Sequence, residues 1–193
     1  MKFCSECATP VEWTIPEGDH LPRHVCPKCE TIFYSNPRII AGCLPIWEDK
    51  VLMCRRNIEP RKDYWTLPAG FMENGETTEQ GAMRETWEEA EAKVDIISLY
   101  THTSIVHVNQ LQLFFLAKMR SPNFSTTTES NEVALFSEDE IPWEEIAFPT
   151  VSNALRLFFK ERNAGGPFHF HRISIDRHNE QNNTSTTQHE IRI

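Results

Sequence analysis

The order of apolar and polar positions predicts a hairpin early in the main part of the chain. Two apolar runs, at residues 39–47 and 51–55, are separated by a polar turn at residues 48–50. Apolar runs of this length bounded by turn residues are typical of β-strands, and a short polar connection is typical of a hairpin. Residues 65–70 predict another short strand, which ends in a proline and glycine break.

Two later segments have the period of helices. The first can be capped by Thr77 or Thr78 and runs to about Glu91. The second, at residues 150–162, repeats apolar residues at a spacing that predicts one buried helical face. Its apolar positions are Val151, Ala154, Leu155, Phe158 and Phe159. Further strands are predicted at residues 94–100, 104–108, 111–118 and 133–136. The polar, turn-rich segment at residues 121–131 predicts a surface loop of the kind that carries function.

The length and the charge of the chain limit the classes of protein to consider. A chain of 193 residues is long enough for one domain of ordinary size and a small appendage. The net charge of -9 argues against a protein that mainly holds a nucleic-acid backbone. It still allows small anionic substrates, because a bound metal supplies local positive charge. No apolar run approaches the length of a membrane span and no secretory leader is visible, so we expect a cytoplasmic protein.

Four of the six cysteines form two closely spaced pairs, Cys4 with Cys7 and Cys26 with Cys29. Two such pairs, separated here by eighteen residues, match the spacing of a four-thiolate zinc ribbon. The ion supplies folding energy that so small a segment cannot obtain from a core. A pair of disulfides is the alternative, which a reducing compartment disfavours. The pattern therefore predicts a closed, structural zinc site.

Changes in composition predict three regions. The ribbon is expected at residues 1–35, and a turn at Asn36 and Pro37 marks the boundary that follows. The predicted strands and helices lie in a domain at residues 36–162. Residues 163–193 form a polar tail, within which residues 179–190 predict disorder.

Three glutamates of the first predicted helix lie on one of its faces. Glu85, Glu88 and Glu89 are spaced by three and four residues, which places their side chains above one another. Like charges repel, and the repulsion grows in a cleft of low dielectric. A divalent cation would turn this repulsion into a binding site. A solvated acidic helix face is the alternative.

The residues around these glutamates resemble a known motif. Gly70 is followed after five residues by Glu76, and after seven more by the segment RETWEE at residues 84–89. This arrangement resembles the Nudix box of the Nudix hydrolases. The resemblance is close over residues 70–92, and the predicted order of strands and helices is similar along about residues 39–162.

The resemblance implies an α/β/α sandwich with a mixed sheet. It also implies hydrolysis of a nucleoside diphosphate linked to another moiety, with Mg²⁺ or Mn²⁺ as the catalytic metal. The chain departs from the family pattern at three positions. Thr86 and Ala92 replace larger aliphatic residues, and Glu91 stands where the family usually has a glycine, which puts the shape of the helix exit in doubt.

The resemblance also implies roles for single residues. Glu85 and Glu89 are expected to be primary metal ligands, with Glu88 as a ligand or a close partner. Ala69 is expected to contribute its carbonyl oxygen. Mg²⁺ prefers such oxygen ligands, and keeps waters and substrate phosphates as its remaining ligands.

Other residues are expected to support this centre. By the resemblance, Glu76 and Arg84 tie the loop to the helix, and the general base comes from a loop late in the chain. The candidates there are Glu129 and Glu132, of which Glu132 is preferred because it lies next to a predicted strand. Either could instead be an ordinary surface carboxylate.

The identity of the substrate depends on residues outside the box. Members that cleave NADH and also have a zinc ribbon carry the motif SQPWPFP after the box, and residues 101–121 contain nothing like it. Val108 stands where the ADP-ribose subgroup typically has a proline. The ribbon, the segment SNPRIIAG and the box are together similar to Nudix proteins described as FAD and ADP-ribose pyrophosphatases. Cleavage of either compound releases AMP.

Aromatic and basic residues near the predicted site are candidates for substrate binding. An aromatic ring could stack on adenine or isoalloxazine, although packing in the core is the alternative for each ring. Arginine could hold phosphate through its fixed fork of donors. The candidates are Trp65, Phe71, Trp143 and Phe148 for stacking, and Arg55 and Arg56 for phosphate.

A small nucleotide is therefore the expected partner, and the resemblance implies a homodimer. The rival hypothesis is a regulator that senses a nucleotide without cutting it and contacts nucleic acid through its ribbon. The basic residues of the ribbon, Lys2, Arg23 and Lys28, are outnumbered by acidic ones, which weakens contact with nucleic acid. An intact set of metal-binding carboxylates favours catalysis.

Overall fold

The computed structural model describes residues 1–176 and 187–188, and the chain divides into two units. The first unit comprises Met1–Pro37 and the second begins at Arg38. The first unit contains a small antiparallel sheet of three strands, β1 (Glu12–Thr14), β2 (Arg23–Val25) and β3 (Ile32–Phe33). Each unit has its own sheet, so we describe the units separately.

Two similar turns carry the cysteines of the first unit. The N–H of Cys4 donates to the carbonyl of Thr9 at 2.8 Å, and the N–H of Cys26 donates to the carbonyl of Thr31 at 3.0 Å. Each turn passes through a residue with a left-handed backbone, Ala8 in the first and Glu30 in the second. The equivalent geometry brings the two cysteine pairs to one side of this small unit.

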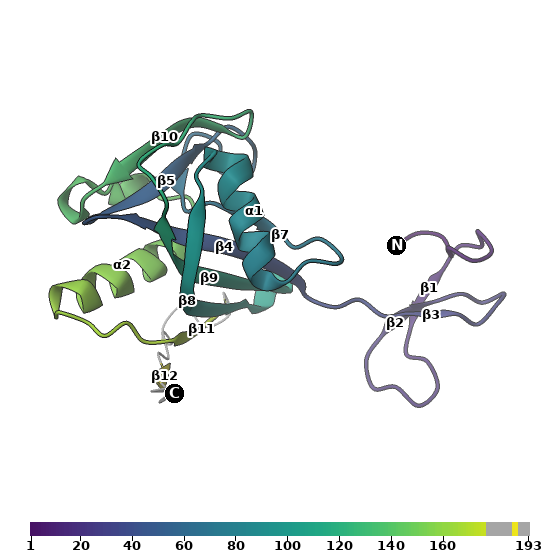
Figure 1. The fold of residues 1–193 in the computed structure, drawn as a ribbon. Helices are drawn as coiled ribbons and strands as arrows, with labels where there is room; N and C mark the ends of the chain where they lie inside the picture. Colours follow the sequence, from purple (N-terminus) through teal and green to yellow (C-terminus); the bar gives the residue numbers. More distant parts are fainter. Residues whose placement is uncertain (177–186, 189–193) are drawn as a thin grey trace. The chain divides into compact units, whose positions relative to one another are not determined.

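The second unit is built on a mixed sheet (Figure 1). Its main path runs in the order β10-β5-β4-β9-β8-β11-β12, with β6 paired to β5 and β7 to β4. The pairs β4 with β9 and β8 with β11 are parallel, and the other pairs are antiparallel. The strands are β4 (Arg38–Trp47), β5 (Lys50–Arg56), β6 (Trp65–Thr66), β7 (Ala69–Phe71), β8 (Val94–Ile105), β9 (Gln110–Met119), β10 (Ser130–Phe136), β11 (His171–Ile175) and β12 (Thr187–Gln188).

Two helices cover the two faces of this sheet. Alternate residues of the central strands point to opposite faces, so Leu44 packs in the cluster that includes α2 (Pro149–Asn163), whereas Cys43 packs in the cluster beneath α1 (Thr78–Ala90). Three short 3₁₀ helices, η1 (Val106–Val108), η2 (Glu138–Glu140) and η3 (Trp143–Glu145), lie in the connections. The predicted α/β/α sandwich is confirmed. Within the described residues, neither helix has the length and apolar character needed to cross a membrane.

Capping sets both ends of α1. The Thr77 hydroxyl accepts from the N–H of Gln80 at 3.2 Å, and the Gln80 side chain accepts from the N–H of Thr77 at 2.8 Å. This reciprocal arrangement satisfies two N–H groups that the helix itself leaves unpaired. At the other end, Glu91 adopts a left-handed backbone with φ 49° and donates its N–H to the carbonyl of Trp87. The helix exit therefore has the turn that a glycine usually makes, although glycine is absent.

Two of the predicted strands are wrong in their bounds. Residues 94–100 and 104–108 were expected to be separate strands, yet β8 continues through residues 101–103 and ends at Ile105. The strand lies inside the sheet between β9 and β11, where Thr101 and Thr103 are buried, and threonine packs well on a pleated surface. Residues 106–108 form η1 and not the end of a strand.

Strand β11 lies in the segment that the composition assigns to a polar tail. It runs parallel to β8, and its first residue, His171, is fully buried. Glu161 of α2 accounts for this burial, because its carboxylate lies 3.0 Å from His171 Nε2 and accepts a hydrogen bond from the Tyr100 hydroxyl at 3.0 Å. A buried polar residue is tolerated when it has such partners. The disorder predicted for residues 179–190 falls mostly outside the described residues.

Candidate active site

Two glutamates of α1 are buried against the loop that carries β7. Glu89 is 6% exposed and Glu85 is 8% exposed. The N–H of Ala69 donates to Glu89 Oε2 at 3.1 Å. Gly70 allows the close approach of the second carboxylate, because a Cβ atom at this position would overlap the carboxylate of Glu85. The short strand that follows the proline break therefore sits directly on the acidic face of the helix.

Arg84 connects this loop to three glutamates. Its guanidinium forms a two-bond pair with Glu76, with Nε and Nη2 donating to the two carboxylate oxygens at 3.0 and 2.9 Å. Its Nη1 donates to Glu85 and to Glu88, each at 2.8 Å. A further bond runs from Nη2 to the carbonyl of Phe71 at 3.1 Å. The planar fork of arginine matches this convergence of carboxylates, and a lysine could not reproduce it.

Burial and ion pairing move the pKa values of these carboxylates in opposite directions. The hydrogen bonds from Arg84 lower the pKa of Glu76 to about 2. Burial raises the pKa of Glu89 to about 8, and burial also raises the pKa of Glu85. Burial disfavours a charged carboxylate unless a cation or hydrogen-bond donors offset the loss of water. Glu85 and Glu89 are thus the groups that gain most from a nearby cation.

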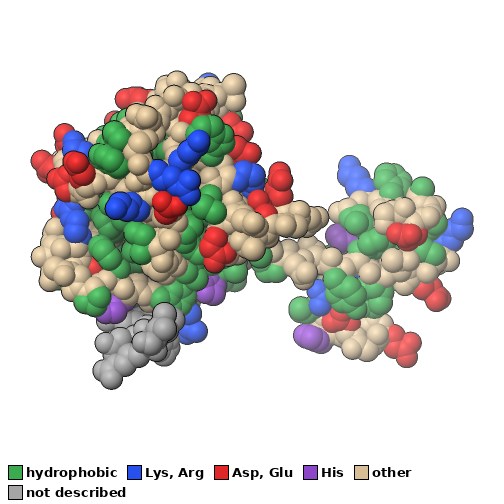
Figure 2. Space-filling model, in the orientation of Figure 1, with side chains coloured by type: hydrophobic (Ala, Val, Ile, Leu, Met, Phe, Trp, Pro, Cys, Tyr) green, Lys and Arg blue, Asp and Glu red, His purple; other side chains and the backbone are tan. Residues whose placement is uncertain are grey.

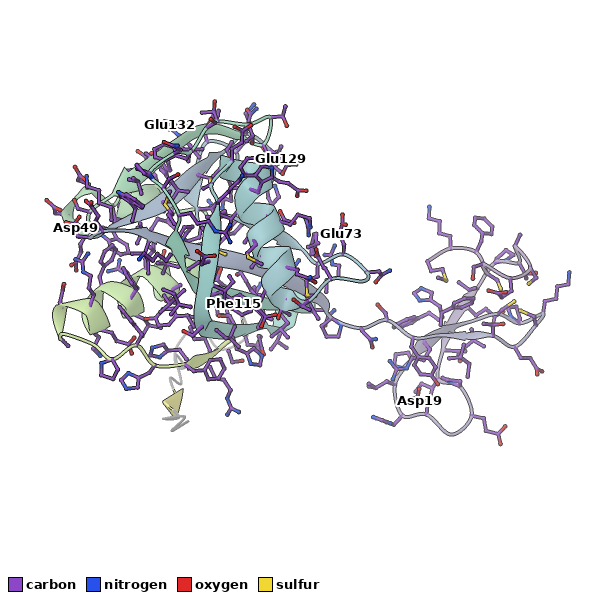
Figure 3. The ribbon with its side chains drawn as sticks, in the orientation of Figure 1. Asp19, Asp49, Glu73, Phe115, Glu129 and Glu132 are labelled. Carbon is purple, nitrogen blue, oxygen red and sulfur yellow. The ribbon has the colours of Figure 1, made fainter. Side chains whose placement is uncertain are left out.

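The structure separates the two candidates for a general base. The charge of Glu129 acts on both Glu85 and Glu89. Glu132 instead lies 3.3 Å from Arg55 as an ion pair. Figure 3 shows Glu129 in the loop beside α1 and Glu132 along β10. Of the two candidates, Glu129 is the one whose charge acts on the buried glutamates.

The two predicted phosphate-binding arginines also have different surroundings. Arg55 contacts Glu132 and Glu145, the latter at 3.6 Å, and its Nε donates to the carbonyl of Asp63. Arg56 donates from its Nε to the carbonyl of Pro60 at 2.8 Å, and its charge lowers the pKa of Glu89 against the effect of burial. Figure 2 shows basic and acidic side chains side by side on this unit. Of the two arginines, Arg56 is therefore the one whose positive charge acts on the buried carboxylate of Glu89.

The predicted stacking residues are only partly available. Trp65 is 5% exposed and packs edge-on against Phe136 in the core. Its burial supports the packing alternative for this ring. Phe71 is 46% exposed, with the guanidinium of Arg38 over its ring. Trp143 is half-buried beneath the guanidinium of Arg156, 4.2 Å from its ring centre.

Some contacts of this region were not visible in the sequence. The loop before β10 is tied to the end of α1 by two bonds, from the N–H of Ser125 to the carbonyl of Ala90 and from the Thr127 hydroxyl to the carbonyl of Glu89. Glu129 follows this anchored segment directly. No local pattern marks Ser125 or Thr127, because their partners depend on how the loop folds back onto the helix.

The four predicted zinc ligands meet in the first unit. The ligand atoms of Cys4, Cys7, Cys26 and Cys29 all lie within 4.8 Å of one another. The closest sulfurs are 3.5 to 3.6 Å apart, close to the roughly 3.8 Å expected between thiolates around a tetrahedral zinc ion. All the cysteines are free thiols, so the disulfide alternative is wrong.

The carboxylates of α1 are less closely grouped than the thiols. Among the described residues, the four thiols bring their ligand atoms within 4.8 Å of one another, and the carboxylates of α1 do not form such a group. Arg84 holds Glu85 and Glu88 on either side of its Nη1. The α1 centre nevertheless fits a hard cation, because its donors are all oxygens and two of its carboxylates are buried beneath Gly70 and Ala69.

Comparison with known proteins agrees with this geometry. Residues 2–35 match the family model described as Nudix N-terminal, and residues 36–158 match the model of the NUDIX domain. A crystal structure of a NUDIX hydrolase from Nitrosomonas europaea is 52% identical with a TM-score of 0.88, and the match covers 92% of this chain and 100% of that one. An ADP-ribose pyrophosphatase from Streptococcus suis shares the fold, with a TM-score of 0.56 at 18% identity, over 72% of this chain and all of that one.

A curated relative, the NAD-capped RNA hydrolase NudC of Chromobacterium violaceum, is 34% identical over 61% of this chain and 42% of its own length. The chain thus spans less than half of this relative. The matched NUDIX domain nevertheless covers more than half of the chain, and the thiol cluster lies within the N-terminal match. The chain therefore belongs to the Nudix hydrolase family and carries the N-terminal zinc-ribbon module of that family.

Proposed function

We propose that this protein hydrolyses the diphosphate of a nucleoside diphosphate linked to another moiety, at the acidic face of α1. The observation that carries the proposal is the burial of Glu89 and Glu85 beneath the Ala69–Gly70 backbone. Burying two carboxylates together is unfavourable without a cation. Family membership supports the same chemistry, since the matched domain is that of the Nudix hydrolases. A site built in this way suits phosphate chemistry assisted by a divalent metal.

The residues proposed to hold Mg²⁺ or Mn²⁺ are Glu85, Glu89 and the Ala69 carbonyl, with Glu88 as a further ligand or partner. When bound, such an ion would neutralise the diphosphate and stabilise the negative charge that develops on the phosphate oxygens. Glu89 is held in place by the N–H of Ala69, and Gly70 leaves room for Glu85. Four thiolates, by the same reasoning from ligand type and spacing, suit a structural Zn²⁺ in the first unit.

The surrounding side chains have distinct roles in this proposal. Arg84 neutralises part of the acidic face and, through Glu76, fixes the loop that carries β7. Arg56 supplies positive charge near Glu89, where a substrate phosphate would lie. In hydrolysis, a water oxygen bonds to phosphorus as the bond to the bridging oxygen breaks. We assign the proton of that water to Glu129, because its charge reaches Glu85 and Glu89.

For the substrate, we propose ADP-ribose or FAD, with AMP as one product. The similarity of the ribbon, the SNPRIIAG segment and the box to FAD and ADP-ribose pyrophosphatases supports this choice, and the absence of the SQPWPFP motif argues against NADH. The relative named as an NAD-capped RNA hydrolase favours a second candidate, an NAD-type dinucleotide. All of these substrates share the adenosine diphosphate unit. Homodimerisation and a cytoplasmic location stay predictions.

A substrate panel tests the proposal. The full chain is incubated with FAD, ADP-ribose, NAD⁺, NADH and a nucleoside triphosphate at equal concentrations, with Mg²⁺ and with a chelator. We expect metal-dependent release of AMP from at least one of the four diphosphate-linked compounds, and the fastest release from ADP-ribose or FAD. Fastest cleavage of NAD⁺ or NADH would support the second candidate. Binding without cleavage of any compound would support the sensor hypothesis and contradict catalysis.

A further inference from the structure

Thr127 connects the proposed base to the helix that carries the buried glutamates. Its hydroxyl donates to the carbonyl of Glu89 at 3.4 Å, and the same oxygen accepts from the N–H of Glu129 at 3.2 Å. A hydroxyl offers one donor and two acceptor positions, so both bonds can form at once. One side-chain oxygen therefore links the backbone of Glu129 to the last turn of α1.

The helix side of this link is a carbonyl that α1 itself leaves unpaired. The last four carbonyls of a helix have no partner within the helix, and Glu89 is the residue before the last of α1. Its carbonyl accepts from the Thr127 hydroxyl and, at 3.8 Å, from the Cys54 thiol. The next carbonyl, of Ala90, accepts from the N–H of Ser125 at 2.8 Å. The loop is thus bonded to the end of α1 at two successive residues.

The other side of the link is bonded to the sheet. The carbonyl of Glu129 accepts from the N–H of Asn57, the residue after β5, at 2.8 Å. The Asn57 side chain donates to the carbonyl of Thr128 at 3.0 Å. The N–H of Thr127 donates to the carbonyl of Ser130 at 3.0 Å, which closes a turn around Glu129. Both main-chain groups of Glu129 are therefore bonded, the carbonyl to the sheet and the N–H, through Thr127, to the helix.

The backbone has to set the place of the Glu129 carboxylate, because packing does not. Glu129 lies in the loop beside α1 (Figure 3), and its side chain is exposed. A general base acts only within hydrogen-bond reach of the proton that it takes. A displacement of about 1 Å costs on the order of a hundredfold in rate. A cap on α1 would account for the bond to Glu89 but not for the bond from the Glu129 N–H.

We propose that Thr127 is a positioning residue for the hydrolysis, whose hydroxyl fixes the loop so that the Glu129 carboxylate stays beside the buried glutamates of α1. Thr127 acts through Glu129 and not on the substrate. The inference rests on the proposed function, in which Glu129 takes the proton of the attacking water. It adds a requirement for a hydroxyl at position 127, which serine meets and valine, of almost the same shape as threonine, does not.

Amide hydrogen exchange tests the link without catalysis. In the full chain without substrate, the N–H of Glu129 loses its acceptor in Thr127→Val and keeps it in Thr127→Ser. The exchange rate of this amide, measured by NMR, is expected to rise at least about fivefold in Thr127→Val and to stay within about twofold in Thr127→Ser. Thr128→Val is the matched control, because Thr128 is exposed and bonds to Asn57 through its carbonyl, which the change leaves in place. An unchanged rate in Thr127→Val would overturn the proposal.

Kinetics show whether the link serves catalysis. In metal-dependent AMP release, kcat of Thr127→Val is expected to fall at least about tenfold with KM within about twofold, and Thr127→Ser should keep kcat within about threefold of the wild type. Thr86→Val is the matched control, because it removes a hydroxyl bond within α1, to the carbonyl of Ala82 at 2.7 Å. That change should cost stability and leave kcat within about threefold. An equal loss of kcat in Thr86→Val and Thr127→Val would contradict positioning.

A double-mutant cycle separates positioning from a structural role. If Thr127 acts through Glu129, adding Thr127→Val to Glu129→Gln should lower kcat by less than about twofold. The same loss in both backgrounds would overturn the proposal. Wild-type kcat in Thr127→Val beside a large loss in Glu129→Gln would refute the positioning role and leave the proposed function intact. Absence of AMP release by the wild type would refute the proposed function, and the exchange rates would then decide the link alone.

Discussion

Replacing Gly70 by alanine should separate the geometry of the active site from the stability of the fold. Gly70 lies in β7, and its φ is outside the left-handed region, so alanine can adopt the same backbone. The three atoms nearest to the new Cβ are all carboxylate atoms of Glu85, which it would overlap. These atoms are the far end of a flexible side chain. The carboxylate should therefore move aside while β7 keeps its pairing with β4.

Because the Glu85 carboxylate is what has to move, Gly70→Ala should change the catalytic rate much more than the free energy of unfolding. The free energy of unfolding should change by no more than about 1 kcal/mol, because alanine also reduces the freedom of the unfolded chain. Displacing a catalytic group by about 1 Å costs on the order of a hundredfold in rate, which corresponds to about 2.7 kcal/mol of barrier. The assay compares urea unfolding curves and metal-dependent AMP release for the wild type and Gly70→Ala.

Gly42→Ala is the matched contrast. A Cβ there would overlap the Pro68 carbonyl and the backbone of Ala69, which cannot move as a side chain can. This variant should lose stability as well as activity. If Gly70→Ala retained activity within about twofold of the wild type, the close approach of Glu85 to this glycine would have no catalytic role.

Three further measurements address the brace, the base and the ribbon. In the folded protein the pKa of Glu76 is lowered from 4.5 to about 2, so its pairing with Arg84 stabilises the fold above about pH 4.5 and this contribution is lost as the pH falls towards 2. The unfolding free energy of Glu76→Gln should therefore depend less on pH in that window, and equal slopes in acid titrations would contradict the pairing. Glu129→Gln should lower kcat by about 10² or more while Glu132→Gln changes it little, and the reverse order in steady-state assays would overturn the assignment. Cys26→Ser should abolish zinc binding, measured by elemental analysis, and destabilise the first unit; a wild-type chain without zinc would refute the ribbon site.

The sequence predicts the local elements of this fold well where local signals are strong. The hairpin of β4 and β5 forms with Ile46 opposite Val51, and α1 begins after the cap at Thr77. It fails where a distant partner decides. The composition of residues 163–193 predicts a polar tail, yet β11 forms there and Glu161 supplies the partner that allows His171 to be buried. No local pattern contains that information.

The same distinction holds at the candidate site. Spacing alone places Glu85 and Glu89 on one helical face, and both are found buried there. The surroundings of Glu129 and Glu132 depend on which way a loop returns to the helix, and the sequence does not contain that information; the choice of base between them stays a proposal. The sequence also does not predict that Trp87 is exposed. Its position on the helix does not show that residues 126–128 lie opposite it, with a depression between the helix and this loop.

The central claim is that the buried carboxylate of Glu89 supports metal-dependent diphosphate hydrolysis. Glu89→Gln removes the charge at almost constant shape and leaves a group that can still accept the N–H of Ala69. With ADP-ribose and Mg²⁺, AMP release by this variant should fall by more than about a hundredfold while its unfolding curve stays that of a folded protein. Activity within about tenfold of the wild type, or about 1.4 kcal/mol of barrier, would contradict the claim.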